Sequence, residues 1–564
     1  MNKILKFSSK SVLLASALIV FASCNDKWND HYSYKTDSDH PVAKLYDALS
    51  DMENYDKFCK ALETTYLCNK DGKRYENDQS FMDLLLQDQF LTVWAPSNKS
   101  ISDDDWKKYT DPNKSDSLNK EVGDKFIKNH IARFKHTAGV AGPNIFMLSG
   151  KTFKVDPAAV GGQASNEKNI RCLNGILHCL DGYLEYRQSL YEYIVEAPEY
   201  KDLIGDWFKG FTKVEIDPTR SIASGTDENG EMIWIDAVMV ESNILMDKFG
   251  YIHTEDSLYA VVLPTPELWQ TQFNRIKEYF YYVQKGLDND SLQKFYTRTT
   301  MMADMFFNIK EGSQFYMPDS VFSTLYNRTE NRRDNLPYHI FGKPYEAGGL
   351  FADAVKTIDC SNGTIYVIDK WPFEDTLNFK RPIRLEAENY YNLSGLDLYP
   401  RSVNSIGKKQ LEEPVQVMRI SKYGENDWSA KFLIPDNLRG KYAVKIVVAP
   451  NMDARKPNYF HPRVAYNSPN QYDSVLIDSN TVVWTYLEDW DLWIDDIGPL
   501  YLVNDTSKID TMEIGDIFIP YCNYDMNQSA LSVTIKNGIT TSSLAVQYAT
   551  ELWVDCILLE PVVE

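Results

Sequence analysis

The chain has 564 residues, and 43 % of them are hydrophobic. That length exceeds what one hydrophobic core can fill, so we expect two to four domains. The 59 basic and 80 acidic residues give a formal net charge of −21, which disfavours nucleic acid and anionic membrane surfaces as partners.

The N-terminal segment has the pattern of a secretory signal. Lys3, Lys6 and Lys10 precede an apolar run at 12–22 that is too short to span a bilayer. The segment ends in Ser23-Cys24, and small residues before a cysteine resemble the lipobox of bacterial lipoproteins. The resemblance implies a signal peptide over 1–23, lipid such as palmitate on Cys24 and an acidic tether over 24–40. The alternative is an ordinary signal peptide with an incidental cysteine.

Acidic and polar residues follow Cys24 directly, as in the surface-export tag of some Gram-negative lipoproteins. This second resemblance implies a protein anchored by lipid in the outer membrane and exposed at the cell surface. No other stretch is apolar enough to cross a membrane. The other seven cysteines have no framework spacing, and we expect most of them to be buried as small hydrophobic residues.

Three motifs occur twice along the chain in the same order, which indicates a duplicated domain with insertions in the second copy. The first is a helix start, the second a strand ending in proline, and the third an Asn-Gly strand. The paired segments are 45–49 and 190–194, 91–97 and 259–265, and 174–181 and 362–369.

Within the first copy, apolar spacing predicts helices before a small sheet, which is an α+β arrangement. Ser97-Asn98 follows the proline that ends a strand and is expected to cap the next helix. The predicted helices are 41–58, 81–86 and 125–134, and the predicted strands are 90–95, 144–148, 152–155 and 175–180.

The segments 92–98, 129–130, 148–153 and 174–181 resemble the successive motifs of the fasciclin domain. The match covers 41–187, and the copy at 188–372 resembles a degenerate fasciclin domain that lacks the Asn-His pair. The family implies an extracellular adhesion module without catalytic activity, and His130 resembles its buried structural histidine. The residues that carry the resemblance are Pro96, His130, Asn174, Gly175, Pro264, Asn362 and Gly363.

The C-terminal third, 381–564, predicts an all-β sandwich, because short alternating runs replace the helical spacing. Segments 385–388, 433–444 and 553–561 resemble strands of jelly-roll carbohydrate-binding modules, which implies the fold more than a sugar ligand. The predicted strands are 383–387, 415–420, 429–434, 442–449, 482–486, 517–520, 531–535 and 552–559.

An aromatic and acidic cluster in this third is the candidate glycan-binding site. Flat aromatic faces stack on sugar rings, and nearby polar groups bind the hydroxyls. The alternative is a segment of core tryptophans with a solvated acidic rim, and Ca²⁺ binding by the acids is a further open possibility. The aromatic members are Trp484, Tyr486, Trp490 and Trp493.

No sequence motif of a catalytic centre is present, and no cofactor is expected. The sequence thus predicts a multidomain, non-catalytic surface lipoprotein with two α+β fasciclin-like domains followed by a jelly roll. Such a protein resembles the accessory lipoproteins of SusC/SusD-type uptake systems for glycans or peptides. We expect adhesion or scaffolding through a protein partner, and the alternative is glycan binding by the jelly roll.

Overall fold

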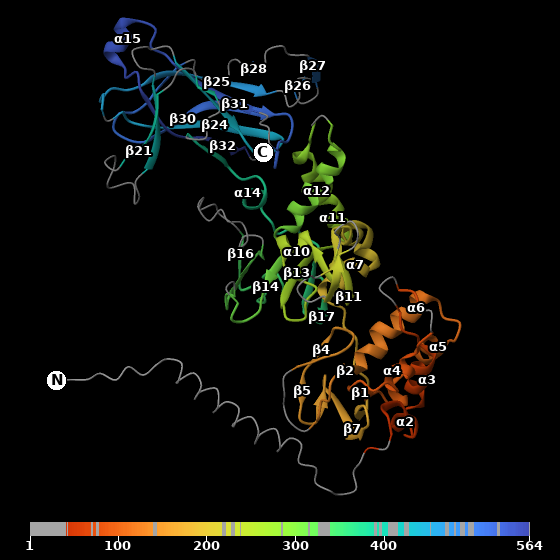
Figure 1. The fold of residues 1–564 in the computed structure, drawn as a ribbon. Helices are drawn as coiled ribbons and strands as arrows, with labels where there is room; N and C mark the ends of the chain where they lie inside the picture. The colour runs from red at the N-terminus through yellow and green to blue at the C-terminus, as the bar shows by residue number, and fades with distance from the viewer. Residues whose placement is uncertain are drawn as a thin grey trace, which may run out of the picture. The chain divides into compact units, whose positions relative to one another are not determined.

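A computed structural model describes residues 41–562. Excepted are residues 42, 69–71, 75–77, 139–143, 217–221, 227–231, 237–238, 284–285, 314–315, 325–338, 388–391, 394–396, 404–414, 422–427, 452, 468–472, 479–480, 486–490, 495–500 and 527–530. The chain forms two compact units that divide between Tyr186 and Arg187, and each is described by itself (Figure 1). No helix among the described residues is long and apolar enough to cross a membrane.

The first unit begins with helices that cover one side of a small sheet (Figure 1). The segment predicted as one helix over 41–58 forms two helices, because Asn54 between them turns the backbone to a φ of +72°. The helices are α2 (Leu45–Ser50), α3 (Asp56–Thr64), α4 (Phe81–Leu85), α5 (Asp103–Thr110) and α6 (Asp116–Glu121).

The helix predicted over 125–134 lies earlier in the chain. After α6, a π-helical turn (Val122–Ile127) and a 3-10 turn (Lys128–His130) lead straight into strand β2. The prediction was therefore wrong at its C-terminal end, where Ile131 to Arg133 pair with β1 in the sheet. Two successive changes of helical pitch obscure the 3.6-residue period on which the prediction depended.

The sheet of the first unit has the strand order β2-β1-β8-β7-β6-β5, with β1 and β8 parallel at its centre. Both central strands are buried along their whole length, as expected for strands with packing on both faces. A short antiparallel pair, β3 with β4, lies beside it. The strands are β1 (Leu91–Ala95), β2 (Ile131–Arg133), β3 (Ile145–Phe146), β4 (Thr152–Phe153), β5 (Val155–Asp156), β6 (Ala159–Val160), β7 (Gln163–Cys172) and β8 (Gly175–Leu180).

The repeated Asn-Gly pair joins the first helix of the copy to its central strands. Oδ1 of Asn174 accepts the N–H of Leu45, while Nδ2 donates to the carbonyls of Leu85 and Gln87. A Cβ atom on Gly175 would lie 2.0 Å from the carbonyl oxygen of Leu91. Only glycine therefore allows the two central backbones to approach so closely.

The second copy contains the same arrangement. Oδ1 of Asn362 accepts the N–H of Leu190, and Nδ2 donates to the carbonyls of Ile252 and Thr254. A Cβ atom on Gly363 would lie 2.0 Å from the carbonyl oxygen of Tyr259. The sequence repeat thus corresponds to a repeated set of buried hydrogen bonds.

The central strands of the second copy, β13 and β18, are parallel and lie in a sheet of order β14-β13-β18-β17. Pro264 ends β13, and its carbonyl accepts the hydroxyl of Tyr200 at 3.0 Å. The principal elements are α7 (Leu190–Glu196), α10 (Ile244–Phe249), β13 (Tyr259–Pro264), α11 (Pro266–Lys277), α12 (Asn289–Met302), β14 (Phe306–Asn308), β17 (Lys356–Cys360) and β18 (Gly363–Ile368).

Each copy buries a histidine that links two distant backbone segments. Nε2 of His130 accepts the N–H of Leu184 at 2.9 Å, and its Nδ1 lies 2.8 Å from the carbonyl of Phe126. In the second copy, Nε2 of His339 accepts the N–H of Glu374 at 2.7 Å. The sequence analysis found no Asn-His pair in the second copy. The buried histidine of this copy, His339, is not part of such a pair, and its Nδ1 contacts Asp304.

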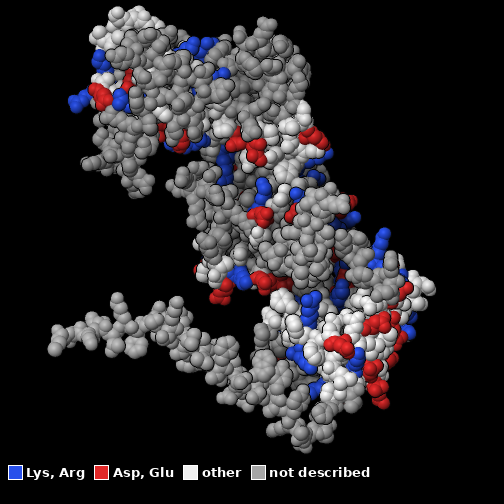
Figure 2. Space-filling model, in the orientation of Figure 1, with Lys and Arg blue, Asp and Glu red and all other residues white. Residues whose placement is uncertain are grey.

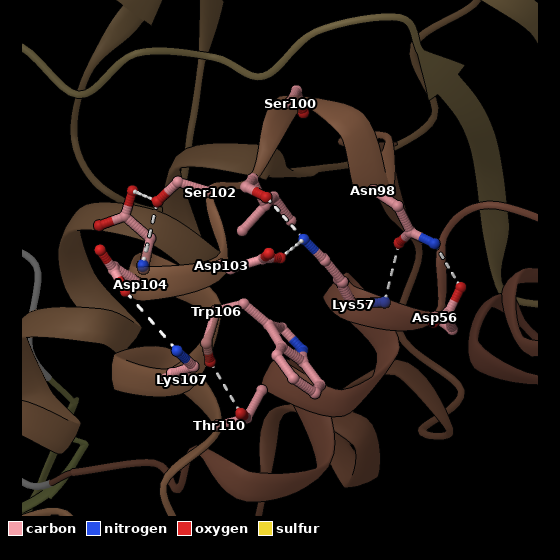
Figure 3. Close-up of polar contacts among 12 residues, drawn as sticks. Asp56, Lys57, Asn98, Ser100, Ser102, Asp103, Asp104, Trp106, Lys107 and Thr110 are labelled. Atoms are coloured by element: carbon pink, nitrogen blue, oxygen red, sulfur yellow. Dashed lines mark hydrogen bonds and ion pairs between the residues drawn. The ribbon is translucent and has the colours of Figure 1, made fainter.

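The expected cap at Ser97-Asn98 serves a different helix from the one predicted. Asn98 caps the preceding α3 through a hydrogen bond from the N–H of Lys57 to its Oδ1, and its Nδ2 contacts Asp56 (Figure 3). Ser97 donates its hydroxyl to the carbonyl of Asp181. The chain folds back so that a cap acts on a helix 41 residues earlier.

The C-terminal part of the second unit is a sandwich of two antiparallel sheets, as predicted. The orders are β21-β22-β32-β24-β30, with β19 beside β32, and β20-β23-β31-β25-β28, with β29 beside β25. The first sheet contains β19 (Ile383–Glu386), β21 (Asp397–Val403), β22 (Val415–Ser421), β24 (Gly440–Ala449), β30 (Asp510–Ile519) and β32 (Leu552–Pro561). The second contains β20 (Asn392–Leu393), β23 (Ser429–Ile434), β25 (Tyr459–Asn467), β28 (Asp491–Ile494), β29 (Leu502–Val503) and β31 (Leu531–Asn537).

The sandwich and the second copy of the repeat pack together within one unit. Backbone hydrogen bonds run from Arg439 to Tyr279 and from Cys522 to Tyr281, and the hydroxyl of Tyr282 donates to the carbonyl of Tyr524. Leu438 and Cys522 belong to the core of the second copy. The second copy and the sandwich thus have separate core clusters that meet within one compact unit.

Candidate functional site

The structure describes the backbone of two of the four predicted glycan-binding residues, and they lie in strands of different sheets. Trp484 lies in β27 (Thr481–Thr485), a strand of a two-stranded sheet with β26 (Asp473–Asp478), and Trp493 lies in β28 opposite Ala465 of β25. Tyr486 and Trp490 lie outside the described residues, as does Cys24. Only Trp493 therefore has a register position in the second sheet of the sandwich.

Strands β25 and β31 have one face in the core and one turned away from it. Phe460 and Val464 of β25, with Val533 and Ile535 of β31, belong to the core cluster of the sandwich. Because side chains alternate along a strand, the intervening residues line the opposite face. We call this surface the tyrosine face, and it comprises Tyr459, His461, Arg463, Ser532, Thr534 and Lys536.

Three tyrosine rings stack at one end of the tyrosine face. The centroid of Tyr459 lies 4.5 Å from that of Tyr501 and 5.0 Å from that of Tyr548, with interplanar angles of 14° and 25°. His461 lies 5.3 Å from Tyr501. Tyr501 remains 36 % exposed, so this stack ends in an aromatic ring open to solvent. Burial and the two neighbouring phenols raise the pKa of Tyr459, which keeps its hydroxyl protonated.

Asn458 joins the three segments that carry the tyrosines. Its backbone N–H donates to Oδ1 of Asn504 at 2.6 Å, and its Nδ2 donates to the carbonyls of Ala549 and Glu551 at 3.1 and 2.7 Å. The neighbouring Gly538 leaves room for the central ring, since a Cβ atom there would lie 2.6 Å from Cδ1 of Tyr459. The stack is therefore positioned by buried hydrogen bonds and by close packing.

Two hydroxyl groups lie buried in the middle of the tyrosine face. Ser532 is fully buried and Thr534 nearly so, and neither hydroxyl oxygen has a hydrogen-bond partner among the described residues. Buried hydroxyls normally find a partner, because an unmade hydrogen bond costs about 1–3 kcal/mol. Both oxygens are closed off from solvent, so they are unsatisfied groups of the sheet interior and a ligand on the surface does not reach them.

Basic side chains lie beside these hydroxyls. Arg463 is opposite Thr534 and Lys536 is opposite His461 in the register of β25 and β31, while Lys431 of β23 is opposite Thr534 on the other side. Burial, and then the charges of Arg463 and Lys536, lower the pKa of His461. The chain as a whole is acidic, with a net charge of −21, but the tyrosine face carries basic side chains, which are hydrogen-bond donors.

The fasciclin-type residues have structural positions. Pro96 and His130 are buried in the first unit, and Pro264 ends a buried strand in the second. The two Asn-Gly pairs, described above, are occupied with backbone hydrogen bonds of their own copies. Among the described residues, no group of three His, Cys, Asp or Glu side chains is arranged to hold a metal ion.

The described surface has mixed charge on the face drawn in Figure 2, where acidic and basic side chains are interspersed. All seven cysteines from Cys59 onward are free thiols, and six of them are buried, as the sequence predicted for most of them. Sequence reasoning missed the tyrosine stack. Its one available signal was the abundance of tyrosine, 36 residues in all.

No protein-family model matches this chain, and no curated protein sequence matches it. Its similarities are to solved structures, at low TM-scores. A family 35 carbohydrate-binding module from Clostridium thermocellum has a TM-score of 0.17 and 12 % identity over 32 % of this chain and 99 % of that one. The C-terminal CBM6 of LamC from Zobellia galactanivorans has a TM-score of 0.14 and 11 % identity. This match covers 32 % of this chain and 99 % of that one.

A third similar structure is the Podospora anserina GH26-CBM35 β-(1,4)-mannanase, with a TM-score of 0.17 and 14 % identity over 33 % of this chain. The match spans 28 % of the mannanase. Likenesses of this size do not identify a family or a ligand for the chain. The assignment of the sandwich therefore stands on its own two sheets and their strand orders.

Proposed function

We propose that the protein is a non-catalytic glycan-binding protein that uses the tyrosine face of its β-sandwich. The observation that carries the proposal is the stack of Tyr459, Tyr501 and Tyr548, which ends in the exposed ring of Tyr501 beside the basic side chains of the tyrosine face. The ring of Tyr501 suits the C–H groups of a pyranose ring, and the basic side chains suit its oxygens.

The site that supports the proposal differs from the predicted tryptophan cluster. Trp493 is opposite Ala465, and Ala465 pairs with Ser532 on its other side, so this tryptophan has a register position next to the tyrosine face. A linear chain of several sugars would extend along the face from the tyrosine stack past Lys536 toward Arg463. This geometry favours an oligosaccharide segment over a single sugar.

Attachment to the cell surface completes the proposal. Lipid on Cys24 would hold the protein at the outer membrane of a Gram-negative bacterium, with the described units extending from residue 41 onward. Both copies of the repeat would be fasciclin-like domains, and the support is their shared Asn-Gly hydrogen bonds and buried histidines. Their role would be to display the sandwich.

The test is affinity electrophoresis of the mature chain against a panel of polysaccharides that includes xylan and β-mannan, followed by a glycan array. We expect retardation by at least one polysaccharide. The variant Tyr501→Ala should weaken that binding about tenfold, the equivalent of about 1.4 kcal/mol. Tyr183→Ala is the control, because Tyr183 is similarly exposed in the first unit, and it should bind as the unaltered chain does.

A second candidate function is adhesion or scaffolding through a protein partner, such as a SusC/SusD-type uptake complex. The duplicated buried framework favours it, since a repeated rigid domain can serve as a spacer or a docking module. If no polysaccharide retards the chain, glycan binding is refuted. Co-purification of an outer-membrane partner by the same chain would then support the scaffold.

A further inference from the structure

Three large apolar side chains are exposed at one end of the sheet in the first unit. The exposed fractions are 53 % for Phe90, 72 % for Phe134 and 50 % for Leu173. The backbone brings them together, because the N–H of Phe134 donates to the carbonyl of Phe90, and that of Leu91 to the carbonyl of Asn174 beside Leu173. We call Phe90, Phe134 and Leu173 the apolar patch.

Phe134 is held outward by an unfavourable backbone. Its φ is +69°, in the left-handed region that bulky residues rarely occupy and that costs about 1–3 kcal/mol. Thr92 fixes this turn, since its hydroxyl donates to the carbonyl of Phe134 at 2.7 Å and accepts the N–H of His136 at 2.9 Å. The fold thus maintains a strained turn that exposes an aromatic ring.

The apolar patch lies where the N-terminal tether joins the first unit. The backbone N–H of Leu173 donates to the carbonyl of Ala43 at 2.9 Å. Only the 17 residues 24–40 lie between the predicted lipid on Cys24 and the described chain. A chain anchored at Cys24 therefore keeps this end of the sheet close to the lipid surface.

The charges around the patch differ from those of the whole protein. The segments that meet there, 43–44, 86–90, 133–135 and 171–173, contain four basic residues and one acid, whereas the chain is strongly acidic. Nζ of Lys135 lies 4.0 Å from the ring centroid of Phe90. Aromatic and basic side chains together are typical of surfaces that enter the lipid interface.

We propose that the apolar patch inserts into the outer leaflet to which Cys24 is anchored and so fixes the first unit against the membrane. The proposal rests on the lipid anchor proposed above but not on glycan binding. A second apolar contact next to the tether would strengthen the attachment, because it removes further apolar surface from water. It would also replace free rotation about the tether by a defined orientation.

The test places a photoreactive benzoylphenylalanine at Phe134 in the mature, acylated chain on vesicles of phosphatidylethanolamine and phosphatidylglycerol (3:1). Irradiation should give phospholipid adducts, detected by mass spectrometry. The matched control carries the same group at Tyr183, an exposed residue beyond the opposite end of β8. We expect at least tenfold more lipid adduct at position 134 than at 183; equal yields, or none at 134, would overturn the proposal.

A second arm separates failure of the patch from failure of the anchor. An N-terminal histidine tag on nickel-chelating lipid replaces the acyl group, and lipid adducts at position 134 should persist. If acylated chains do not float with vesicles but tagged chains crosslink, the anchor fails and the patch stands. Protein adducts at position 134 in whole cells, without lipid adducts, would identify a protein-docking surface instead and refute membrane insertion. Glycan binding should be unchanged in the variant Phe90→Ser/Phe134→Ser/Leu173→Ser.

Discussion

The side chain of Asn174 accepts the backbone N–H of Leu45, 129 residues earlier, at 2.8 Å. Asn362 makes the equivalent bond to Leu190 at 2.9 Å, 172 residues apart. Each asparagine thereby fixes the first helix of its copy to the start of the central strand. Since both side chains are almost fully buried, each of these bonds lies in the folded core of its own copy.

Replacing Asn174 by alanine should destabilise the first unit by about 3 kcal/mol. The change removes one acceptor and two donors and leaves buried backbone groups without partners. Hydrogen exchange followed by mass spectrometry should show faster exchange in peptides of 45–50 and 91–95. Asn362→Ala is the matched control, because it should have the same effect in the second unit only. Faster exchange in both units from either change would contradict this prediction.

Acidification should destabilise the first unit through His130. Burial lowers the pKa of His130 to about 4, against about 6.5 in the unfolded chain. The contribution of neutral His130 to the stability of the folded first unit is complete above pH 6.5. It is lost as the pH falls toward 4, because the unfolded chain takes up the proton first. The difference between the pKa of His130 in the unfolded and the folded chain corresponds to about 3 kcal/mol in the free energy of unfolding.

The measurement compares the unaltered chain with His130→Gln in urea at pH 7 and pH 4.5, with hydrogen exchange reporting on the first unit. The variant cannot take up a proton at this position, so the stability difference between the two proteins should shrink at the lower pH. Other titrating groups cancel in the comparison. A difference that is constant between the two pH values would show that His130 is not responsible.

The sequence predicted those parts of the fold that local patterns encode. Strands β8 and β23 have the predicted limits, because each is a short apolar or alternating run with turn residues at its ends. Strand β25 was missed, since Pro462 interrupts its pattern. Pro462 is tolerated because it falls between the residues that pair with β29 and those that pair with β28. Only the sheet explains that position.

The candidate site could not have been predicted in the same way. Tyr459, Tyr501 and Tyr548 come from three separate segments, and no spacing along the chain relates them. Their contact depends on Asn458, whose partners are equally distant in sequence. Proximity of this kind arises from the closure of the sandwich. The abundance of tyrosine indicated a half-buried, hydrogen-bonding surface but not its place.

Raising the pH should stabilise the first unit through Lys114. This amine is buried beside the carbonyl of Tyr109, and burial, then the charge of Arg74, lowers its pKa to about 8. The unfolded chain binds the proton up to about pH 10.5, so the contribution of Lys114 is lost as the pH falls through 8. Relative to Lys114→Met, the unaltered chain should gain stability between pH 7.5 and 9.5.

Urea denaturation at those two pH values, read by hydrogen exchange in the first unit, measures this gain. The expected change in the stability difference is about 2 kcal/mol, most of the span between the two pKa values. Burial raises the pKa of the Cys59 and Cys172 thiols to about 11, but both thiols are present in the two proteins compared and their effects cancel. If the stability of the unaltered chain relative to Lys114→Met fell with rising pH, the direction assigned to the pKa shift of Lys114 would be wrong.

Gly538→Ala should disrupt the tyrosine stack without unfolding the sandwich. The added methyl group would lie 2.6 Å from Cδ1 of Tyr459 and 2.9 Å from its carbonyl oxygen, so the central ring and the backbone that carries it must both shift away. We expect about a tenfold loss of glycan affinity, similar to Tyr501→Ala, because both changes remove the same aromatic surface. Gly342→Ala is the control, since a methyl group there meets nothing within 4 Å. If Gly538→Ala binds glycan normally while its tyrosine environment changes, the stack is not the binding surface.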